Sequence, residues 1–318
     1  MATRLFRGWY QVGFERELTE RVTPITVGGL HLMLVRDGEG FQAYDAICPH
    51  RGANLAYGGQ LEGNAIRCPF HGHRVGLGEA CDGPFQVRGY RTLSVGGLVF
   101  VLLSEAHENG LTQFLECTNE TYFFVQGFAI KANTPAEMVV ENGFDRAHFR
   151  QVHGLKTDPD LHLVPSEHGE LIVEGAFQAN AFDGAWHSDD AHRASTEIGF
   201  LARIFSPNLC VSRLGDKDGH HLVISGATPN GDNSCTIRVS VAAPAGADGR
   251  APAEQPIRAL LRDSKLAYEQ DMVIWEHRQP DAPSRFQADD DLVIEFHRFC
   301  NGFLEVRQNA ASAADLLR

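Results

Sequence analysis

Two short segments of the sequence each place one cysteine and one histidine on a proline-containing turn. Cys48 and His50 flank a proline in the first segment, and Cys68 and His71 enclose the second. Two thiolates and two imidazoles hold a single Zn²⁺ tetrahedrally, or a [2Fe–2S] cluster with the thiolates on one iron and the imidazoles on the other. The residue types therefore predict a metal centre without selecting between the two.

The surroundings of these segments favour the cluster over zinc, which remains the alternative. Both segments lie on hairpin-like loops in a β-rich region, and each is followed by a glycine, Gly52 or Gly72. We expect these glycines to let backbone amides approach the sulfur atoms. Hydrogen bonds of this kind tune the reduction potential of an iron–sulfur cluster.

A second group of potential ligands falls on a helix that the sequence predicts from about residue 135 to residue 152, ended by Gly154. Glu141, Asp145 and His148 are spaced i, i+4 and i+7, so they would share one face of a regular helix. His153 points away from that face unless the helix ends first. Two imidazoles plus a carboxylate from elsewhere form the facial triad that leaves iron positions open.

Alternatives exist for each part of this second site. His187 and His192 repeat the five-residue spacing, but they lie in a polar stretch and are the weaker pair. We prefer Asp271 as the carboxylate, because its apolar helical neighbours would make a buried charge costly unless a metal or cation met it. The rival is the run Asp289–Asp291, which is expected to be mostly a solvated helix start.

The elements that position these residues predict an α+β chain of two domains. In the first hundred residues, short β-type runs alternate with turn signals, as in a small antiparallel β domain. After a polar passage near residues 105–120, strand candidates lead to a long helix from Ile257 to about Arg278. We expect domains at residues 1–115 and 116–318, the second with an antiparallel sheet wrapped around the long helix.

Composition narrows the possible partners. Of 318 residues 43% are hydrophobic, and 28 basic against 41 acidic residues give a net charge of −13. This charge argues against nucleic acid as a partner. No secretory signal or membrane-length apolar stretch is visible, so we expect a cytoplasmic protein without membrane contact. Five further cysteines are expected to be small buried residues; they are Cys81, Cys117, Cys210, Cys235 and Cys300.

Four segments of the sequence resemble motifs of one enzyme family. CPHRGANL and CPFHGHRVG resemble the cluster-binding motif of Rieske proteins, although His73 stands where that family usually has tryptophan. Asp145, His148 and His153, preceded by Glu-Asn, resemble the mononuclear iron motif of Rieske oxygenases. EQDMVIWEHR, which contains Asp271, is similar to the C-terminal helix of the branch of 3-ketosteroid 9-alpha-hydroxylases and cholesterol 7-desaturases.

The resemblance implies a fold and an activity. It implies an all-β Rieske [2Fe–2S] domain followed by a helix-grip (START/Bet v 1-like) catalytic domain that holds one mononuclear Fe(II). Such an oxygenase component, a monooxygenase or a dioxygenase, uses O2 to hydroxylate, desaturate or dealkylate a mainly apolar organic substrate. Because the sequence contains no convincing nucleotide-binding fingerprint, electrons from NAD(P)H would come from a separate reductase, with or without a ferredoxin.

The resemblance also implies an assembly. Family members of this length form head-to-tail homotrimers, because the two metal centres of one chain lie too far apart for useful electron transfer. Asp145 would then bridge His148 to a cluster ligand, His71, of the adjacent subunit. The simpler role for Asp145 is to orient His148 within its own chain. The substitution at His73 is expected to affect packing and cluster potential rather than cluster identity.

Two other functions fit parts of the sequence. A Rieske-type electron carrier would have the same cluster site without oxygenase chemistry, and a zinc-stabilised protein could bind an apolar ligand without turning it over. The sequence does not identify substrate-binding residues or the position that is oxidised. Phe144, Phe149 and Phe182 lie near the predicted site in sequence, and each is expected to belong to the ordinary core.

Overall fold

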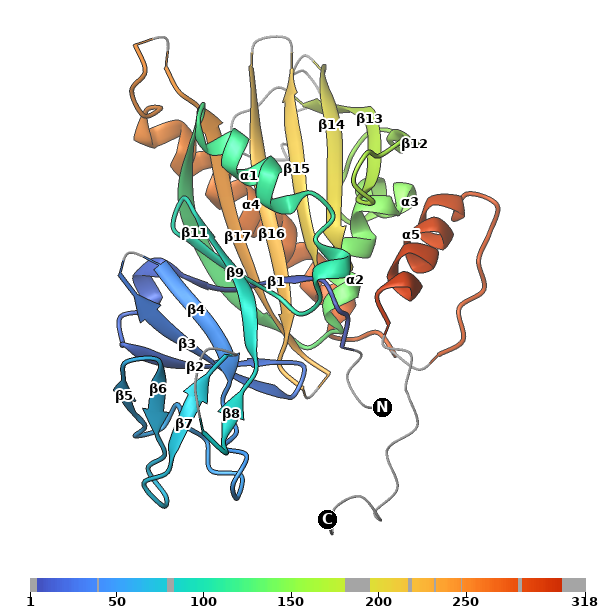
Figure 1. Ribbon diagram of the computed structural model, residues 1–318. Helices are drawn as coiled ribbons and strands as arrows, with labels where there is room; N and C mark the ends of the chain where they lie inside the picture. The colour runs from blue at the N-terminus through green and yellow to red at the C-terminus, as the bar shows by residue number, and fades with distance from the viewer. Residues whose placement is uncertain are drawn as a thin grey trace.

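The structure is a computed structural model. It describes residues 5–38, 40–78, 83–180, 195–216, 219–231, 233–246, 248–279 and 282–304. Two small sheets form the N-terminal part, and a seven-stranded sheet forms most of the C-terminal part. Figure 1 shows these two parts packed side by side.

The N-terminal part is built from hairpins. Its six-stranded sheet has the order β1-β10-β9-β4-β3-β2, and its four-stranded sheet has the order β5-β6-β7-β8. Gly96 and Gly97 form the two-residue turn between β9 and β10 with φ angles of 58° and 77°, the conformation that such hairpins require. The strands are β1 (Trp9–Phe14), β2 (Val22–Val27), β3 (Leu30–Asp37), β4 (Gly40–Asp45), β5 (Gln60–Glu62), β6 (Ala65–Arg67), β7 (Arg74–Leu77), β8 (Gln86–Val87), β9 (Gly89–Val95) and β10 (Leu98–Leu102).

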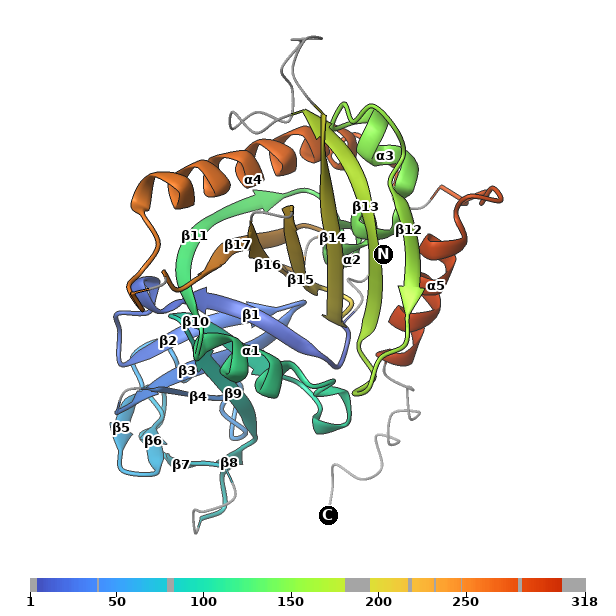
Figure 2. The same ribbon diagram turned by 90° about the horizontal axis from the view of Figure 1, so that it is seen from above.

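The second part is an antiparallel sheet that curves beside a long helix, α4 (Glu254–Trp275). Figure 2 shows α4 running along this sheet, as the sequence predicted. The sheet has the order β11-β17-β16-β15-β14-β13-β12. Its strands are β11 (Tyr122–Ala132), β12 (Asp160–Val164), β13 (Leu171–Asn180), β14 (Ser195–Ser206), β15 (Leu209–Asp216), β16 (Gly219–Pro229) and β17 (Cys235–Pro244).

One hydrophobic core joins the two parts. Trp9 and Phe14 of β1 pack in the same cluster as residues of β15, β16 and helix α1 (Leu111–Asn119). Polar side chains of the large sheet also bind the β1 backbone: Ser206 Oγ donates to the Trp9 carbonyl at 2.8 Å, and Thr228 Oγ1 donates to the Gln11 carbonyl at 2.7 Å. These contacts fix the position of the small sheets relative to the large one.

The predicted single helix over residues 135–152 is wrong. The chain instead forms α2 (Ala136–Glu141), a 3-10 turn (Asn142–Phe144) and α3 (Arg146–Gln151). Asp145 breaks the helix with extended backbone angles, φ −89° and ψ 99°, and its carboxylate caps α3. Asp is a preferred N-cap residue and a weak helix former, so a cap forms here rather than a continuous helix. Gly154 follows α3 with φ 69°, as predicted.

Three further differences concern the remaining elements. Helix α1 lies in the segment that the sequence predicts as a polar passage, and β12 lies in a stretch between Gly154 and the next strand where no strand was predicted. Of the five additional cysteines, Cys210, Cys235 and Cys300 are buried as expected, but Cys117 is exposed, because it lies on the outer side of α1. Cys81, Phe182, His187 and His192 lie outside the described residues.

The last element in the described part is α5 (Asp291–Gly302), which begins within the run of aspartates as predicted. Short 3-10 turns occur at Glu15–Glu17 and Glu105–His107. In the described ranges, the helices are all too short or too polar to cross a membrane.

Candidate metal centres

The two Cys/His segments form matching loops at one end of the N-terminal part. Cys48 and Cys68 are buried, each with 2% exposure. In both loops the amide four residues further on donates to the cysteine carbonyl: Gly52 to Cys48 at 2.9 Å, and Gly72 to Cys68 at 3.0 Å. The two glycines have φ angles of 75° and 71°, which residues with a Cβ rarely adopt. The same tight turn therefore occurs in both loops.

The two glycines do not donate to the sulfur atoms as expected, because their amides bind carbonyl oxygens. Other amides donate to the thiols. They are the amides of His50 and Arg51 at Cys48, and those of Phe70 and His71 at Cys68. Burial acts to raise the pKa of the Cys68 thiol, but its two amide donors and the Cys48 thiol together lower this pKa, whereas burial raises the pKa of Cys48. Such donors stabilise a thiolate, which is the form that binds a metal.

The spacing of the four side chains fits a two-iron cluster better than one zinc ion. The His50 and His71 rings lie 4.8 Å apart, and His50 Nδ1 is a buried atom without a hydrogen-bond partner. Among the described residues, the two cysteines and two histidines do not form a group in which three ligand atoms all lie within 4.8 Å of one another. A tetrahedral zinc ion, with bonds of about 2.0–2.3 Å, would hold its ligands closer.

His73 packs directly against this centre. Its ring lies 4.4 Å from the His50 ring in an edge-on arrangement, and 5.0 Å from the Phe85 ring. Partial desolvation, followed by the nearby His73 and His71 charges, lowers the pKa of His50. The residue at position 73 therefore keeps an aromatic contact with a proposed cluster ligand.

The group that does bring three ligand atoms within 4.8 Å consists of His148, His153 and Asp271. His148 lies on α3, His153 lies just beyond the end of α3, and Asp271 lies on α4. His153 and Asp271 are 8% and 6% exposed. Because α3 ends at Gln151, the backbone turns His153 back toward His148, and their rings lie 5.1 Å apart.

Hydrogen bonds orient both imidazoles. His148 Nδ1 lies 2.5 Å from the carbonyl oxygen of Asp145, and His153 Nδ1 lies 3.0 Å from Gln270 Oε1. Both partners are acceptors, so each Nδ1 donates and each Nε2 presents its lone pair to the centre of the group. Burial lowers the pKa of His148 to about 4, which keeps this ring neutral at pH 7.

Asp271 completes the group with an unsatisfied carboxylate. Its Oδ1 is buried without a hydrogen-bond partner and lies 3.5 Å from His153 Nε2. Burial raises the pKa of Asp271 to about 7, although the Asn142 side chain acts to lower it. A buried, unsatisfied carboxylate beside two imidazole lone pairs fits the two-histidine, one-carboxylate set that binds mononuclear iron.

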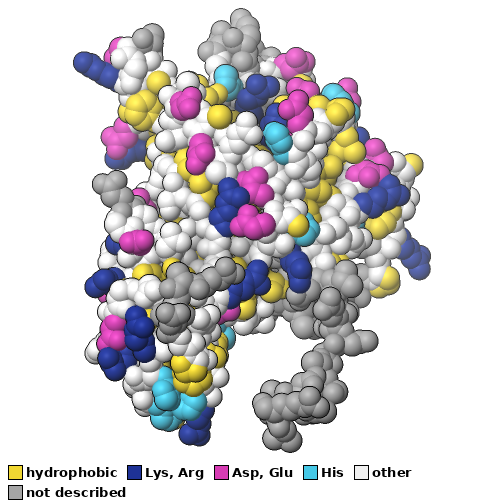
Figure 3. Space-filling view, viewed as in Figure 1, with side chains coloured by type: hydrophobic (Ala, Val, Ile, Leu, Met, Phe, Trp, Pro, Cys, Tyr) yellow, Lys and Arg dark blue, Asp and Glu magenta, His cyan; other side chains and the backbone are white. Residues whose placement is uncertain are grey.

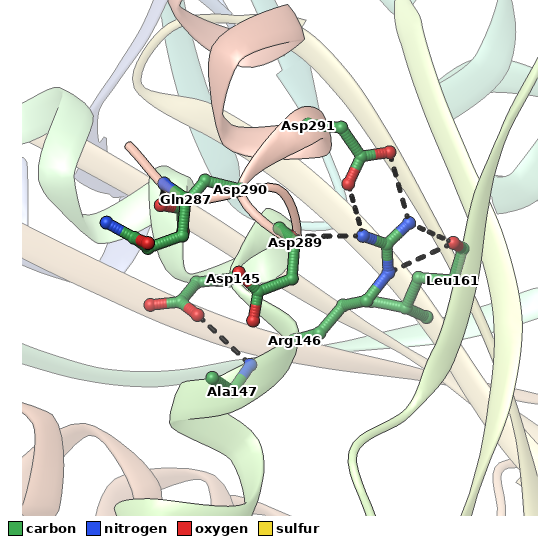
Figure 4. A network of polar contacts seen from close by, with 8 residues as sticks. All are labelled: Asp145, Arg146, Ala147, Leu161, Gln287, Asp289, Asp290 and Asp291. Atoms are coloured by element: carbon green, nitrogen blue, oxygen red, sulfur yellow. Dashed lines mark hydrogen bonds and ion pairs between the residues drawn. The ribbon is translucent and has the colours of Figure 1, made fainter. Parts of the chain in front are cut away.

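The rival aspartates have a different role. Arg146 pairs with Asp291 and also donates to the carbonyl oxygens of Leu161 and Asp289 (Figure 4). Asp290 Oδ2 accepts a hydrogen bond from the Gln287 amide at 2.7 Å. The run at residues 289–291 therefore fastens the start of α5 to α3 and β12, and lies outside the three-residue group.

Asp145 acts on His148 through its backbone. Its Oδ1 accepts hydrogen bonds from the amides of Ala147 at 3.1 Å and His148 at 3.2 Å, and the first is drawn in Figure 4. Burial raises the pKa of Asp145, although these two amides act to lower it. The carboxylate thus starts α3, while the carbonyl oxygen orients the His148 ring. The predicted common helical face of Glu141, Asp145 and His148 does not exist, because the helix breaks at Asp145.

A cavity of about 160 Å³ lies beside the three-residue group. Its walls include Phe149 and Phe200, and Phe144 is fully buried in the core as expected. The sequence did not predict the roles of Asn142 and Gln270, although Asn142 belongs to the Glu-Asn pair before Asp145 and Gln270 is the neighbour of Asp271. Their positions as partners of Asp271 and His153 depend on how α2, α3 and α4 meet.

Comparison with known proteins agrees with this fold and with its division into two parts. Residues 8–90 match the Rieske [2Fe-2S] domain, and residues 105–299 match the 3-ketosteroid 9alpha-hydroxylase C-terminal domain. A cholesterol 7-desaturase from Bombyx mori is 25% identical over 93% of this chain and 69% of its own length. An aminopyrrolnitrin oxygenase from Pseudomonas fluorescens is 26% identical over 95% of this chain and 92% of its own.

Solved structures show the same fold. Dicamba monooxygenase bound to dicamba superposes with a TM-score of 0.68 at 18% identity, over 95% of this chain and 98% of the other. The fold and sites define a Rieske-type non-haem iron oxygenase, whose cofactors are a [2Fe–2S] cluster and a mononuclear iron. Within that class, the chain belongs to the family with the 3-ketosteroid 9alpha-hydroxylase C-terminal domain. Oxygenases of this type work with O2 and a reductase, and a pure electron carrier is the weaker alternative.

Proposed function

We propose that the protein is a terminal oxygenase, whose N-terminal tip would hold a [2Fe–2S] cluster that supplies electrons and whose residues on α3 and α4 would hold the iron that uses them. The proposed ligands are Cys48, His50, Cys68 and His71 for the cluster, and His148, His153 and Asp271 for the mononuclear iron. The observation that carries this proposal is the approach of two oriented imidazoles and one unsatisfied carboxylate within 4.8 Å.

The chain's own residues prepare the iron site for its chemistry. The bound iron would supply the reaction with O2 that oxidises a C–H bond. His148 and His153 are held by Asp145 and Gln270, so ligand orientation does not depend on the metal. Phe149 and Phe200 exclude water on the side of the cavity where a substrate would lie.

The position of the two sites supports electron transfer between subunits. The loops that hold Cys48 and Cys68 lie at the end of the molecule remote from α3, as both Figure 1 and Figure 2 show. We therefore propose a head-to-tail homotrimer in which His71 of one subunit approaches Asp145 of the next. His71 is exposed, as this requires.

The surface around His71 supports docking. Tyr57 and Phe70 are 66% and 60% exposed, which is unusual for large aromatic side chains. Figure 3 shows histidine and hydrophobic side chains gathered at this tip. Arg51 is exposed as well, and its guanidinium lies 5.8 Å from the centre of the Phe70 ring.

The remaining parts of the proposal concern partners and organisation. We infer that NAD(P)H supplies electrons through a separate reductase, with or without a ferredoxin, and that the protein acts in the cytoplasm. We propose that the two units span residues 1–115 and 116–318, so that their boundary falls within α1. The substrate is proposed to be a small, mainly apolar organic molecule, in line with the apolar walls of the cavity.

Complementation between defective subunits tests this function. Cys68→Ala removes a cluster ligand and His148→Ala removes an iron ligand, so each homotrimer should fail to pass electrons from a reduced cluster to the iron. Mixed trimers of the two variants should regain part of this transfer, measured as cluster reoxidation by O2 in a stopped-flow spectrometer. His162→Ala, an exposed histidine on β12, is the control that should behave as wild type. Transfer within isolated monomers, or none in mixed trimers, would contradict the proposal.

A further inference from the structure

The cavity beside the proposed iron ligands is not purely apolar. Apolar side chains form most of its surface, but four hydroxyl groups also line it, two from the paired strands β15 and β16 and two from α4. These hydroxyls belong to Ser212, Ser225, Ser264 and Tyr268. Packing of a hydrophobic core does not require these hydroxyl groups. A few polar groups in an apolar cavity are typical of a ligand-binding site, so we expect them to contact a ligand.

The fold brings two of these hydroxyls together beside Asp271. Ser225 of β16 pairs with Cys210 of β15, and both line the cavity. Tyr268 precedes Asp271 by three residues on α4, so the two side chains share one face of the helix with a rise of about 4.5 Å. A group bound by Ser225 and Tyr268 would lie about one helical turn from the metal ligand.

The pair has one hydrogen-bond donor to spare. Tyr268 Oη donates to Ser225 Oγ at 2.6 Å, which uses one of the two hydroxyl protons. Within the described residues, neither hydroxyl has another hydrogen-bond partner. Ser225 is only 8% exposed, so bulk water is a poor partner for the second proton. A hydroxyl that already accepts a hydrogen bond is polarised and becomes a stronger donor.

The charge of the cavity restricts the ligand further. In the described part of the lining, no lysine or arginine is present, and the charged or titratable groups near the metal end are the proposed iron ligands themselves. An anionic ligand would lose its hydration without a cation to replace it, which is costly. The volume of about 160 Å³ resembles that of cavities of about 150 Å³ that hold a benzene-sized molecule.

We propose that this cavity takes a neutral compound with about one aromatic ring inside it and a hydrogen-bond acceptor, such as a carbonyl oxygen, against the Ser225–Tyr268 pair. The two residues then determine specificity, because they place the acceptor one helical turn from the reacting end. This inference deepens the proposed function and rests on it for the identity of the site.

Ligand binding tests the inference without turnover. The probes are acetophenone, ethylbenzene and phenylacetate, which share one ring but differ in acceptor and charge. Binding is measured by calorimetric titration of the iron-loaded protein. The Ser225→Ala/Tyr268→Phe double variant should bind acetophenone about fivefold more weakly than wild type, which is the effect of one neutral hydrogen bond. Ethylbenzene binding should stay unchanged. Tyr122→Phe, the same chemical change outside this cavity, should alter neither.

Three outcomes would overturn the inference. The double variant could weaken acetophenone and ethylbenzene equally, which would show a merely structural role. Phenylacetate could bind wild type as tightly as acetophenone, or none of the probes could bind. Iron content measured on the same samples reports separately on the proposed function. If the protein binds the probes as expected but holds no mononuclear iron, the metal assignment is contradicted, whereas the role of Ser225 and Tyr268 in binding the acceptor is retained.

Discussion

His153 Nδ1 lies 3.0 Å from the side-chain oxygen of Gln270, the residue directly before Asp271 in α4. One short stretch of this helix therefore supplies both a proposed iron ligand and the group that orients another. The end of α3 and the C-terminal part of α4 are joined at this point, so the geometry of the site depends on how the two helices pack.

Loss of Gln270 should weaken iron binding. Gln270→Ala removes the acceptor that holds the His153 ring, and loss of such an orienting partner typically costs about 10–100-fold in metal affinity. Anaerobic Fe(II) titration of the protein measures this affinity. Glu269→Ala changes the neighbouring exposed residue, which pairs with Lys265, and should leave the affinity as in wild type. Equal affinity in both variants would show that Gln270 does not orient a ligand.

Asp145 can be tested with two substitutions that separate its roles. Asn caps a helix as well as Asp does, whereas Ala typically costs about 1 kcal/mol at this position. Asp145→Asn should therefore keep the free energy of unfolding, and Asp145→Ala should lower it by about that amount. If the carboxylate also bridges subunits, both variants should slow cluster reoxidation in stopped-flow experiments. Wild-type rates in Asp145→Asn would limit this residue to helix capping and to the orientation of His148 by its carbonyl.

Arg146 should stabilise the packing of α5. It connects Asp291, at the start of α5, to the carbonyl oxygen of Leu161 on β12. Arg146→Ala should lower the free energy of unfolding by about 1–3 kcal/mol, because the carbonyl acceptors lose a charged donor. Chemical denaturation measures this change. Arg298→Ala removes an exposed i, i+3 pair with Glu295 on the same helix and should have little effect.

His221 should make stability depend on pH. Burial, followed by the charge of His220, lowers the pKa of His221 to about 4 in the folded chain. The unfolded chain takes up this proton near pH 6.5. Folding stability from this group is therefore present above about pH 6.5 and is lost as the pH falls toward 4. Denaturation curves of His221→Gln should lose part of this slope, and an unchanged slope would assign the acid sensitivity to other groups.

The candidate metal ligands could be proposed from the sequence because the spacing within each Cys/His or His/His pair is local. Cys48 and His50, or His148 and His153, lie within one turn or loop, so their chemistry is visible before the fold is known. Asp271 could be preferred over the run at residues 289–291 because a buried carboxylate among apolar residues needs a cation. The structure places Asp271 with the two histidines, and it places the run at the start of α5.

The parts that sequence reasoning missed depend on tertiary contacts or on competing local preferences. The helix break at Asp145 results from capping, which outweighed a regular helical spacing. The partners Gln270, Asn142 and Tyr268 become neighbours of the site only when α2, α3, α4 and the sheet meet. Helix α1 was not predicted because most of its residues are polar. Leu111 and Leu115 are its buried residues, and they pack in the shared core.

Metal analysis tests the central claim most directly. Iron and acid-labile sulfide should be measured on anaerobically purified wild type and on His148→Ala, together with EPR spectra after dithionite reduction. The account predicts three irons and two sulfides per chain in wild type, and two irons, two sulfides and an unchanged cluster signal in the variant. Zinc in place of iron and sulfide, or the same iron content in both proteins, would contradict it.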